Sequence, residues 1–445
     1  MNQKLTRNSF SRRDFLKLAG ASVLTAAGAS LLPQFLRKNL FADDVVMAAD
    51  PAPNLYFGGT DGWMFLPPSP ALPPYFPDDL APAPFNTYIF GFRNITGYTD
   101  EMKIAQKEKA QHVAPLFWLD QYNGSNEFHL QVTNLGLNLR PDLVDEHTLH
   151  WHGFRNVIPY FDGEPTGSVS IPIGRDFTYV YRPHDPGTYM YHCHVEDVEH
   201  VHQGMNGLVF VRPIQNGNTG LYPSGKFVYN DGDGSTGYDR EFALHLSEVW
   251  THSHWNGSHI QETDWSDYKA DFALLNGRVY PYTLAPNGSI DPFNPVADAN
   301  GDLIPPAGYP ELQYQPLSAL VTCNAGERVL LRFSNLGFRE SSMTLAGIKM
   351  RVVGRDATLM RGRDGTDTSY LTDTVMLGAG ESFDCIFTAP AHSGGAGPDK
   401  YVLFNRNYNR MDNLADGFGG QRTEVHVYPA GTVAPQAHPN DWGLA

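Results

Sequence analysis

Two short histidine-rich stretches decide how this chain folds: Tyr191-His192-Cys193-His194 and, upstream of it, His147-Thr148-Leu149-His150-Trp151-His152-Gly153. In an extended strand, successive side chains point to opposite faces. Cys193 is therefore expected to face one way, and its two neighbouring histidines the other. A thiolate, two imidazoles and a weak thioether are the ligands of blue electron-transfer copper, and the residues that fit this set are His147, Cys193, His200 and Met205. The imidazoles on the opposite face form a second cluster: His150, His152, His192 and His194.

The ordinary explanation of a single histidine or cysteine is a polar surface group or a small core residue. Two separate groups of histidines, one of them interrupted by a cysteine, are not explained in this way. Imidazole and thiolate together select copper, zinc or iron. The position of Met205 and the strand alternation favour copper over zinc.

The two stretches resemble the metal-binding motifs of the multicopper oxidases, the laccase-like cupredoxin family. Phe161-Asp162-Gly163, Ile171-Pro172-Ile173 and Asp185-Pro186-Gly187-Thr188-Tyr189 resemble further segments of that family, so that the resemblance covers nearly all of residues 115–212. It implies a two-domain cupredoxin protein with type 1 copper in its first domain. The implied ligands are His147, Cys193, His200 and Met205 for type 1 copper, His150 for type 2 copper, and His152, His192 and His194 for type 3 copper.

The copper loop departs from the family in its spacing. The family places the second type 1 histidine four residues after the last histidine of H-C-H, where this chain has Val198. His200 lies two residues later and keeps four residues between itself and Met205. That frame resembles the longer loops of the copper nitrite reductases. His202 is the competing candidate, and the spacing to Met205 favours His200.

Alternating segments separated by Gly- and Pro-rich turns predict an all-β fold of two Greek-key, cupredoxin-like β-sandwich domains. A charged stretch at residues 100–111 is the one segment expected to be helical or a solvated excursion. The expected segments along the chain are domain 1 at residues 50–212 (with a Pro-rich, irregular arm at 50–86), a linker at 213–238, domain 2 at 239–430, expected to be metal-free, and a tail at 431–445.

The resemblance implies a copper-dependent oxidoreductase. A small reducing substrate would give single electrons through the exposed edge of a type 1 histidine, and the electrons would pass from Cys193 through His192 and His194 to a cluster that reduces O2 to water. Asp162 matches the family's acidic residue beside that cluster and is the expected proton relay. The alternatives are a copper nitrite reductase-like enzyme and a non-catalytic type 1 electron carrier, although a carrier does not need the second group of imidazoles.

Only half of the type 2/type 3 cluster is encoded in the recognised motifs. At the two corresponding positions domain 2 has Ser341-Ser342-Met343 and Phe404-Asn405-Arg406-Asn407, without histidine. Two copies of domain 1 facing each other across a two-fold axis would supply the missing imidazoles. Another source is Thr251-His252-Ser253-His254 of a neighbouring subunit, with His259 nearby, although a polar loop is the ordinary explanation of that stretch. A homo-oligomer that shares a copper cluster at an interface is therefore expected.

The N-terminus indicates the compartment. Ser11-Arg12-Arg13-Asp14-Phe15-Leu16-Lys17, followed by an apolar, Ala-rich stretch, resembles a twin-arginine export signal. Residues 1–42 are the expected signal peptide, with cleavage after Ala42 or nearer Ala49. Glycine and hydroxyl residues interrupt the apolar stretch, so no retained membrane span is expected. The destination is periplasmic or extracellular, where Cys323 and Cys385 are free to form a disulfide if they meet.

Charge and composition bound the partners. The 445 residues carry a formal net charge of −16, which argues against nucleic acid and anionic membranes as partners. Aromatic residues make up 12% of the chain and charged residues only 18%, as in an ordered protein with a large core. The expected partners are a small reducing substrate and O2.

Overall fold

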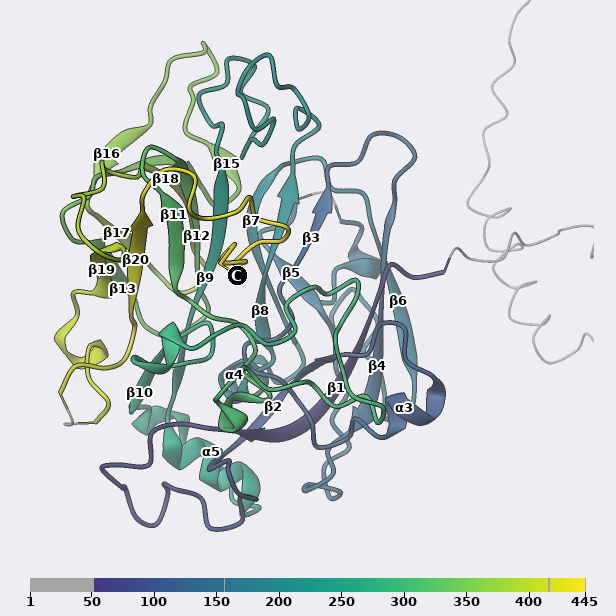
Figure 1. The fold of residues 1–445 in the computed structure, drawn as a ribbon. Coiled ribbons are helices and arrows are strands. Elements are labelled where there is room, and N and C mark those ends of the chain that lie inside the picture. The colour runs from purple at the N-terminus through teal and green to yellow at the C-terminus, as the bar shows by residue number, and fades with distance from the viewer. Residues whose placement is uncertain (1–51, 156, 415–416, 445) are drawn as a thin grey trace, which may run out of the picture. The chain divides into compact units, whose positions relative to one another are not determined.

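The structure is a computed structural model that describes residues 52–155, 157–414 and 417–444. Residues 53–445 form one compact unit, in which four sheets pair into two β-sandwiches (Figure 1). Each sandwich encloses its own hydrophobic core between two sheets. The predicted all-β, two-sandwich fold is therefore confirmed. The predicted signal peptide at residues 1–42 lies outside the described residues.

Domain 1 consists of two four-stranded sheets. The strands of the first sheet, in spatial order, are β2 (Thr87–Asn94), β1 (Leu55–Met64), β4 (Phe128–Gly136) and β6 (Asp176–Tyr181). Those of the second are β3 (Phe117–Asp120), β8 (Asn206–Arg212), β7 (Gly187–His192) and β5 (His150–His152). Aromatic side chains such as Phe117, Trp151 and Tyr191 fill the space between the sheets. The strands that carry the histidine motifs, β5 and β7, are neighbours in the second sheet.

The N-terminal arm is only partly irregular. Residues 55–64 form β1, which pairs with β2 and β4, and Leu55 and Phe57 are fully buried in the core of domain 1. The expectation of an irregular arm over 50–86 was wrong for this strand, because pairing with β2 and β4 holds it in an extended conformation. Residues 65–86, which contain most of those prolines, include no strand or helix.

Domain 2 has a seven-stranded and a five-stranded sheet. The first contains β10 (Phe272–Leu275), β9 (Arg240–Val249), β12 (Arg328–Asn335), β18 (Ser382–Thr388), β14 (Met350–Arg355), β15 (Thr358–Leu359) and β16 (Tyr370–Thr372). The second contains β11 (Val321–Asn324), β20 (Arg422–Tyr428), β19 (Asp399–Asn405), β13 (Ser341–Leu345) and β17 (Thr374–Leu377). Cys323 and Cys385 are both buried in its core as free thiols.

The helices of the described residues are short. The α-helices are α3 (Asp100–Ile104), α4 (Asp197–Gln203) and α5 (Thr251–Ser258). The single-turn 3-10 helices are η1 (Pro159–Phe161), η2 (Trp265–Asp267), η3 (Tyr282–Leu284), η4 (Pro310–Leu312) and η5 (Tyr408–Arg410). None of the helices in the described part of the chain has the length and hydropathy needed to cross a bilayer.

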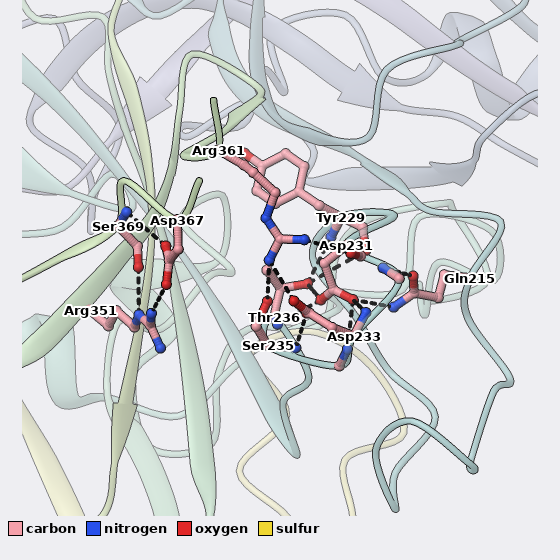
Figure 2. A network of polar contacts seen from close by, with 12 residues as sticks. Gln215, Tyr229, Asp231, Asp233, Ser235, Thr236, Arg351, Arg361, Asp367 and Ser369 are labelled. Atoms are coloured by element: carbon pink, nitrogen blue, oxygen red, sulfur yellow. Dashed lines mark hydrogen bonds and ion pairs between the residues drawn. The ribbon is translucent and has the colours of Figure 1, made fainter. Parts of the chain in front are cut away.

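The segment at 213–238, predicted to be a linker, is fastened to domain 2. Figure 2 shows Arg361 reaching into this segment, where its guanidinium donates to the carbonyl of Asp231 at 2.7 Å and to the carboxylate of Asp233 at 2.8 Å. The Asp231 carboxylate in turn accepts from the backbone N–H of Thr236 at 2.7 Å. These polar contacts give the segment a defined path, so it does not behave as a free spacer.

Buried carboxylates of domain 2 bind side chains of domain 1. Glu241 on β9 accepts from Arg212 on β8 at 2.7 Å and from Arg332 on β12 at 3.0 Å. Burial alone would raise the pKa of Glu241, but the two guanidinium groups outweigh it and lower that pKa to about 2. Thr188 on β7 donates to Asp384 on β18 at 2.6 Å. Charges buried in this way must remain paired, which fixes β7 and β8 against domain 2.

Three histidines are fully buried where the domains meet, namely His112, His245 and His254. Burial lowers the pKa of His245 to about 3 and the pKa values of His112 and His254 to about 4. These imidazoles are therefore neutral in the folded protein at neutral pH. In the unfolded chain the same groups titrate near pH ~6.5.

Acidification should therefore destabilise the fold below pH ~6.5, because the unfolded chain binds protons that the folded chain does not. Each of the three histidines should lower the free energy of unfolding by about 1.4 kcal/mol per pH unit between pH ~6.5 and its folded pKa. Denaturant unfolding at a series of pH values measures this slope. In His254→Asn the slope of the free energy of unfolding against pH should be shallower by about 1.4 kcal/mol per pH unit, the contribution of one histidine. An unchanged slope would show that His254 is not held neutral in the folded chain.

Candidate metal centre

The first cluster brings together His147, Cys193 and His200, whose ligand atoms all lie within 4.8 Å of one another. His147 precedes β5, Cys193 directly follows β7 and His200 lies on α4. The Nδ1 atoms of His200 and His147 are 3.3 Å and 4.0 Å from the Cys193 sulfur. All three side chains are fully buried.

Met205 lies next to this group, at the point where the chain enters β8. Its backbone N–H donates to the carbonyl of His200 at 2.9 Å, and its carbonyl accepts from the N–H of Cys193 at 3.1 Å. A Cβ at Gly59 would lie 2.7 Å from His147 Cδ2 and 3.4 Å from Met205 Cε, which places the thioether beside the imidazole. The four sequence-predicted type 1 residues are thus side by side.

The donor set of the first cluster fits copper. Burial alone would raise the pKa of the Cys193 thiol, but His200 and His147 outweigh it and hold that pKa well below its usual range. The N–H of Thr148 also donates to the sulfur at 3.4 Å. A thiolate with two imidazole Nδ1 atoms turned toward it and a thioether nearby is the ligand set that selects copper.

Neither ligand imidazole has an exposed edge. His147 and His200 are both 0% exposed, and the Nε2 of His200 lies 3.3 Å from a carboxylate oxygen of Asp145. The expectation that electrons enter through an exposed histidine edge was therefore wrong. The Asp145 carboxylate, in the segment before β5, lies at that edge. Its role was not visible in the sequence, where it is one acid among many.

His202, the competing type 1 candidate, lies elsewhere. It is on the same helix as His200 but its ring contacts Trp265, Tyr268 and Phe338 of domain 2. Two residues along an α-helix turn a side chain to a different face. The structure therefore places His200, and not His202, beside Cys193.

The second cluster lies across the β5–β7 pair. His150 faces His192 in the register of the two strands, and one nitrogen from each of His150, His152 and His192 lies within 4.8 Å of the others. The His194 ring centre is 5.1 Å from that of His150. The Nδ1 atoms of His150 and His192 each lie 2.8 Å from a backbone carbonyl, which leaves their Nε2 atoms for a metal.

These imidazoles are suited to bind metal because they are neutral. Burial lowers the pKa of His192 to about 3 and also lowers the pKa values of His150 and His152. Unlike the first cluster, the second is partly open to solvent, since His150, His152 and His194 are only half-buried. The carboxylate of Asp162 lies 3.5 Å from His150 Nδ1, and the side chain is 29% exposed. The expected relay residue therefore stands between the cluster and solvent.

The histidines at 252–254 do not form a polar loop that is free to reach another subunit. They lie on α5, and the ring of His254 is buried in its own chain with Nδ1 2.5 Å from the carbonyl of Tyr88. The ring of His252 packs at a tilt against that of Tyr75, with the ring centres 4.2 Å apart. His259 contacts Asp79 at 3.1 Å. The interpretation of His254 as a ligand donated to a neighbour was wrong, because helix packing draws it inward.

Domain 2 touches the second cluster through a glycine. Gly380 has φ +79°, and a Cβ at this position would lie 2.8 Å from His152 Nε2 and 3.1 Å from its Cε1. The turn that precedes β18 thus packs directly on one imidazole of the cluster. Sequence reasoning missed this contact, since the two residues are far apart in the chain.

Gly380→Ala should displace His152 and weaken metal binding at the second cluster. Because an alanine is disfavoured in the left-handed conformation, the substitution should also lower the free energy of unfolding by about 1–2 kcal/mol. Gly394→Ala is the matched control, because Gly394 has φ +85° with nothing within 4 Å of its would-be Cβ. Unfolding and copper-binding titrations of both variants measure the two effects. Equal copper binding by the two variants would contradict the contact.

Comparison with known proteins agrees with this geometry. A multicopper oxidase family model matches residues 129–216, and a second model of the same description matches residues 241–430, so that together they span more than half of the chain. A laccase of Cryphonectria parasitica is 25% identical over 307 residues, which are 67% of this chain and 40% of that protein. An L-ascorbate oxidase of Brassica rapa subsp. pekinensis is 26% identical over 249 residues, 54% of this chain and 37% of that protein. The chain thus spans less than half the length of these curated relatives.

Solved structures share the fold. A blue copper oxidase from Nitrosomonas europaea superposes with a TM-score of 0.55 at 18% identity, covering 84% of this chain and 85% of that one. A copper nitrite reductase from the same organism gives 0.50 at 14% identity, covering 87% and 96%. Identities this low show the fold alone. The two family matches and the laccase relative establish that the chain is a laccase-like member of the multicopper oxidase family, and membership of that family implies that it binds copper.

Proposed function

We propose that this chain is an exported oxidase that oxidises a small reducing substrate one electron at a time and couples this to the reduction of O2 to water. The observation that carries the proposal is the arrangement of two ligand clusters on opposite faces of one strand end. Copper, when bound, supplies the one-electron couple at the first cluster and the oxygen chemistry at the second. The assigned ligands are His147, Cys193, His200 and Met205 for type 1, His150 for type 2, and His152, His192 and His194 for type 3.

The chain itself provides a short link between the two clusters. Cys193 is joined by single peptide bonds to His192 and His194, and His192 Nδ1 lies 2.8 Å from the carbonyl of Cys193. Burial of the first cluster excludes water, whereas three of the four imidazoles of the second cluster are partly exposed to solvent. Asp162 is placed to exchange protons with solvent, as a general acid–base group near an oxygen-reducing site requires.

The cluster is completed, in this proposal, by another copy of the chain. The two positions expected from domain 2 lie in β13 and β19, where Ser341 and Asn405 are buried and hydrogen bonded within the sheet. Half-exposed imidazoles on domain 1 are compatible with a second set of imidazoles across a two-fold axis. We therefore expect a homo-oligomer that shares its type 2/type 3 cluster at an interface, and export by the twin-arginine route to the periplasm or beyond.

The reducing substrate is expected to be small and to meet an acidic surface. Asp145 lies over the edge of His200, and ligand atoms of Asp145, Glu196 and His200 lie within 4.8 Å of one another. Electrons must cross this carboxylate layer because the imidazole beneath it is fully buried. Negative charge there favours cationic donors and makes the rate of association depend on ionic strength.

Copper stoichiometry tests the proposal. Copper per chain, an EPR spectrum and the molar mass in solution should be measured on one sample. We expect five coppers per dimer if two copies of domain 1 share one trinuclear site. Four coppers per chain would mean that every chain has a complete cluster, with the missing ligands supplied by domain 2 or by a partner. Two coppers per chain would favour a nitrite reductase-like site. One copper per chain with only a type 1 signal would exclude oxygen reduction and leave an electron carrier.

Two substitutions separate the clusters. Cys193→Ser should abolish the blue absorption, because the sulfur ligand is lost. His152→Ala should keep the blue colour but lower the rate of O2 consumption by a factor on the order of a hundred, because one assigned ligand of the second cluster is lost. Absorption spectra and an oxygen electrode measure both effects. A blue Cys193→Ser protein would refute the ligand assignment.

A further inference from the structure

The stretch from His200 to Met205, called the copper loop here, is held from outside domain 1. We propose that buried histidines at the domain interface form a clasp by which domain 2 positions the copper loop and so sets the geometry of the type 1 site. This inference rests on the proposed assignment of His200 and Met205 as ligands. The clasp consists of His112, His202, His245 and His254.

The contact made by His245 has the clearest geometry. On β9 of domain 2, its Nε2 lies 2.8 Å from Oδ1 of Asn206, the residue after Met205. The Nδ2 of Asn206 donates to the carbonyl of Val201 on α4 at 2.7 Å, which fixes the orientation of the amide. Since Oδ1 only accepts, Nε2 of His245 carries the proton. Nδ1 therefore accepts from the Ser334 hydroxyl at 2.7 Å. One chain of hydrogen bonds thus runs from β12 through His245 to the copper loop.

In the contact made by His202, the histidine belongs to domain 1 and its partner to domain 2. It belongs to the copper loop, and its Nε2 accepts from the backbone N–H of Trp250 in domain 2 at 3.1 Å. Its ring centre is 5.1 Å from that of His254, and the imidazole of His254 bonds across the interface to the carbonyl of Tyr88 on β2. Helix α4 is therefore held between domain 2 on one side and β2 on the other.

The fourth histidine acts where the helix ends. His112 of domain 1 lies with Nε2 3.3 Å from the Ser247 hydroxyl on β9. Its Nδ1 would lie 3.0 Å from a Cβ at Gly204, the residue that ends α4 with φ +126°. A side chain at Gly204 would also come within 2.7 Å of the carbonyl of Phe90. The loop turns here in a space that admits only glycine, directly before Met205.

These contacts converge on residues that separate two copper ligands. Val201, His202, Gly204 and Asn206 all lie between His200 and β8 or at its first residue. The contacts with domain 2 therefore act on the segment that sets the separation between His200 and Met205. The axial ligand is one of the features that tune the reduction potential of a blue copper site. Domain 2 supplies none of the assigned ligands, but in this way it positions two of them.

The test uses the copper-loaded full-length chain and reads the type 1 site directly. His245→Leu removes both hydrogen bonds of His245, whereas His245→Gln keeps an N–H donor at the position of Nε2. The control is His392→Asn, in the exposed turn before β19, where the imidazole contacts the carbonyl of Gly397. EPR spectrum, reduction potential, the rate of copper loss to a chelator and the melting temperature are measured for each.

In His245→Leu we expect a changed type 1 EPR spectrum and copper loss at least tenfold faster than in the native chain. His245→Gln should recover most of both properties, and His392→Asn should match the native chain. A His245→Leu protein with a lowered melting temperature but native spectrum, potential and copper-loss rate would overturn the clasp and leave only a structural contact.

If His245→Leu does not fold, Ser334→Ala decides the question, since it removes only the hydroxyl that orients His245. A shift of the EPR spectrum or potential in that variant supports the clasp, and native values overturn it. Failure of the proposed function is recognised separately, because the native chain itself would then lack a type 1 signal.

Discussion

The alternation of side chains at the end of β7 is the constraint on which the rest of this molecule depends. β7 is held between β5 and β8 by antiparallel pairing, so the chain leaving it cannot rotate. Cys193 must then point into the sandwich while its neighbours point away. Both clusters follow from this choice, because Cys193 is buried in the core beside two imidazoles, whereas three of the four imidazoles on the other face are only half-buried. One strand end thus presents two faces with different exposure to solvent.

The surrounding packing gives the two faces opposite environments. Phe90 lies edge-on to the ring of His200, with the ring centres 5.7 Å apart, so that an aromatic side chain covers the first cluster on this side. On the other face, the pairing of β5 with β7 brings imidazoles together, and backbone carbonyls take up their Nδ1 atoms. In His150 and His192 the partner of Nδ1 thus leaves Nε2 as the nitrogen available to a metal, a general device of metal sites.

Sequence reasoning predicted the fold and named the residues that the structure brings together in the two clusters, because most of them lie in two short motifs whose spacing reflects strand geometry. It could not place Asp145, Gly380 or the interface histidines. Their contacts depend on how loops and domains pack across large separations in the chain, and no local pattern encodes that. The Pro-rich arm misled for a related reason, since β1 owes its conformation to pairing with β2 and β4 rather than to its own composition. The N-terminal signal and the completion of the second cluster remain predictions.

The contact between Gly380 and His152 has a consequence for how such a protein can change over time. A domain without ligands would ordinarily be free to drift in sequence, constrained only by its own stability. Here one of its turns packs against an imidazole with no space for a methyl group, so part of its surface is inherited together with the metal site. A chimera that exchanges domain 2 must therefore carry the matching turn with it.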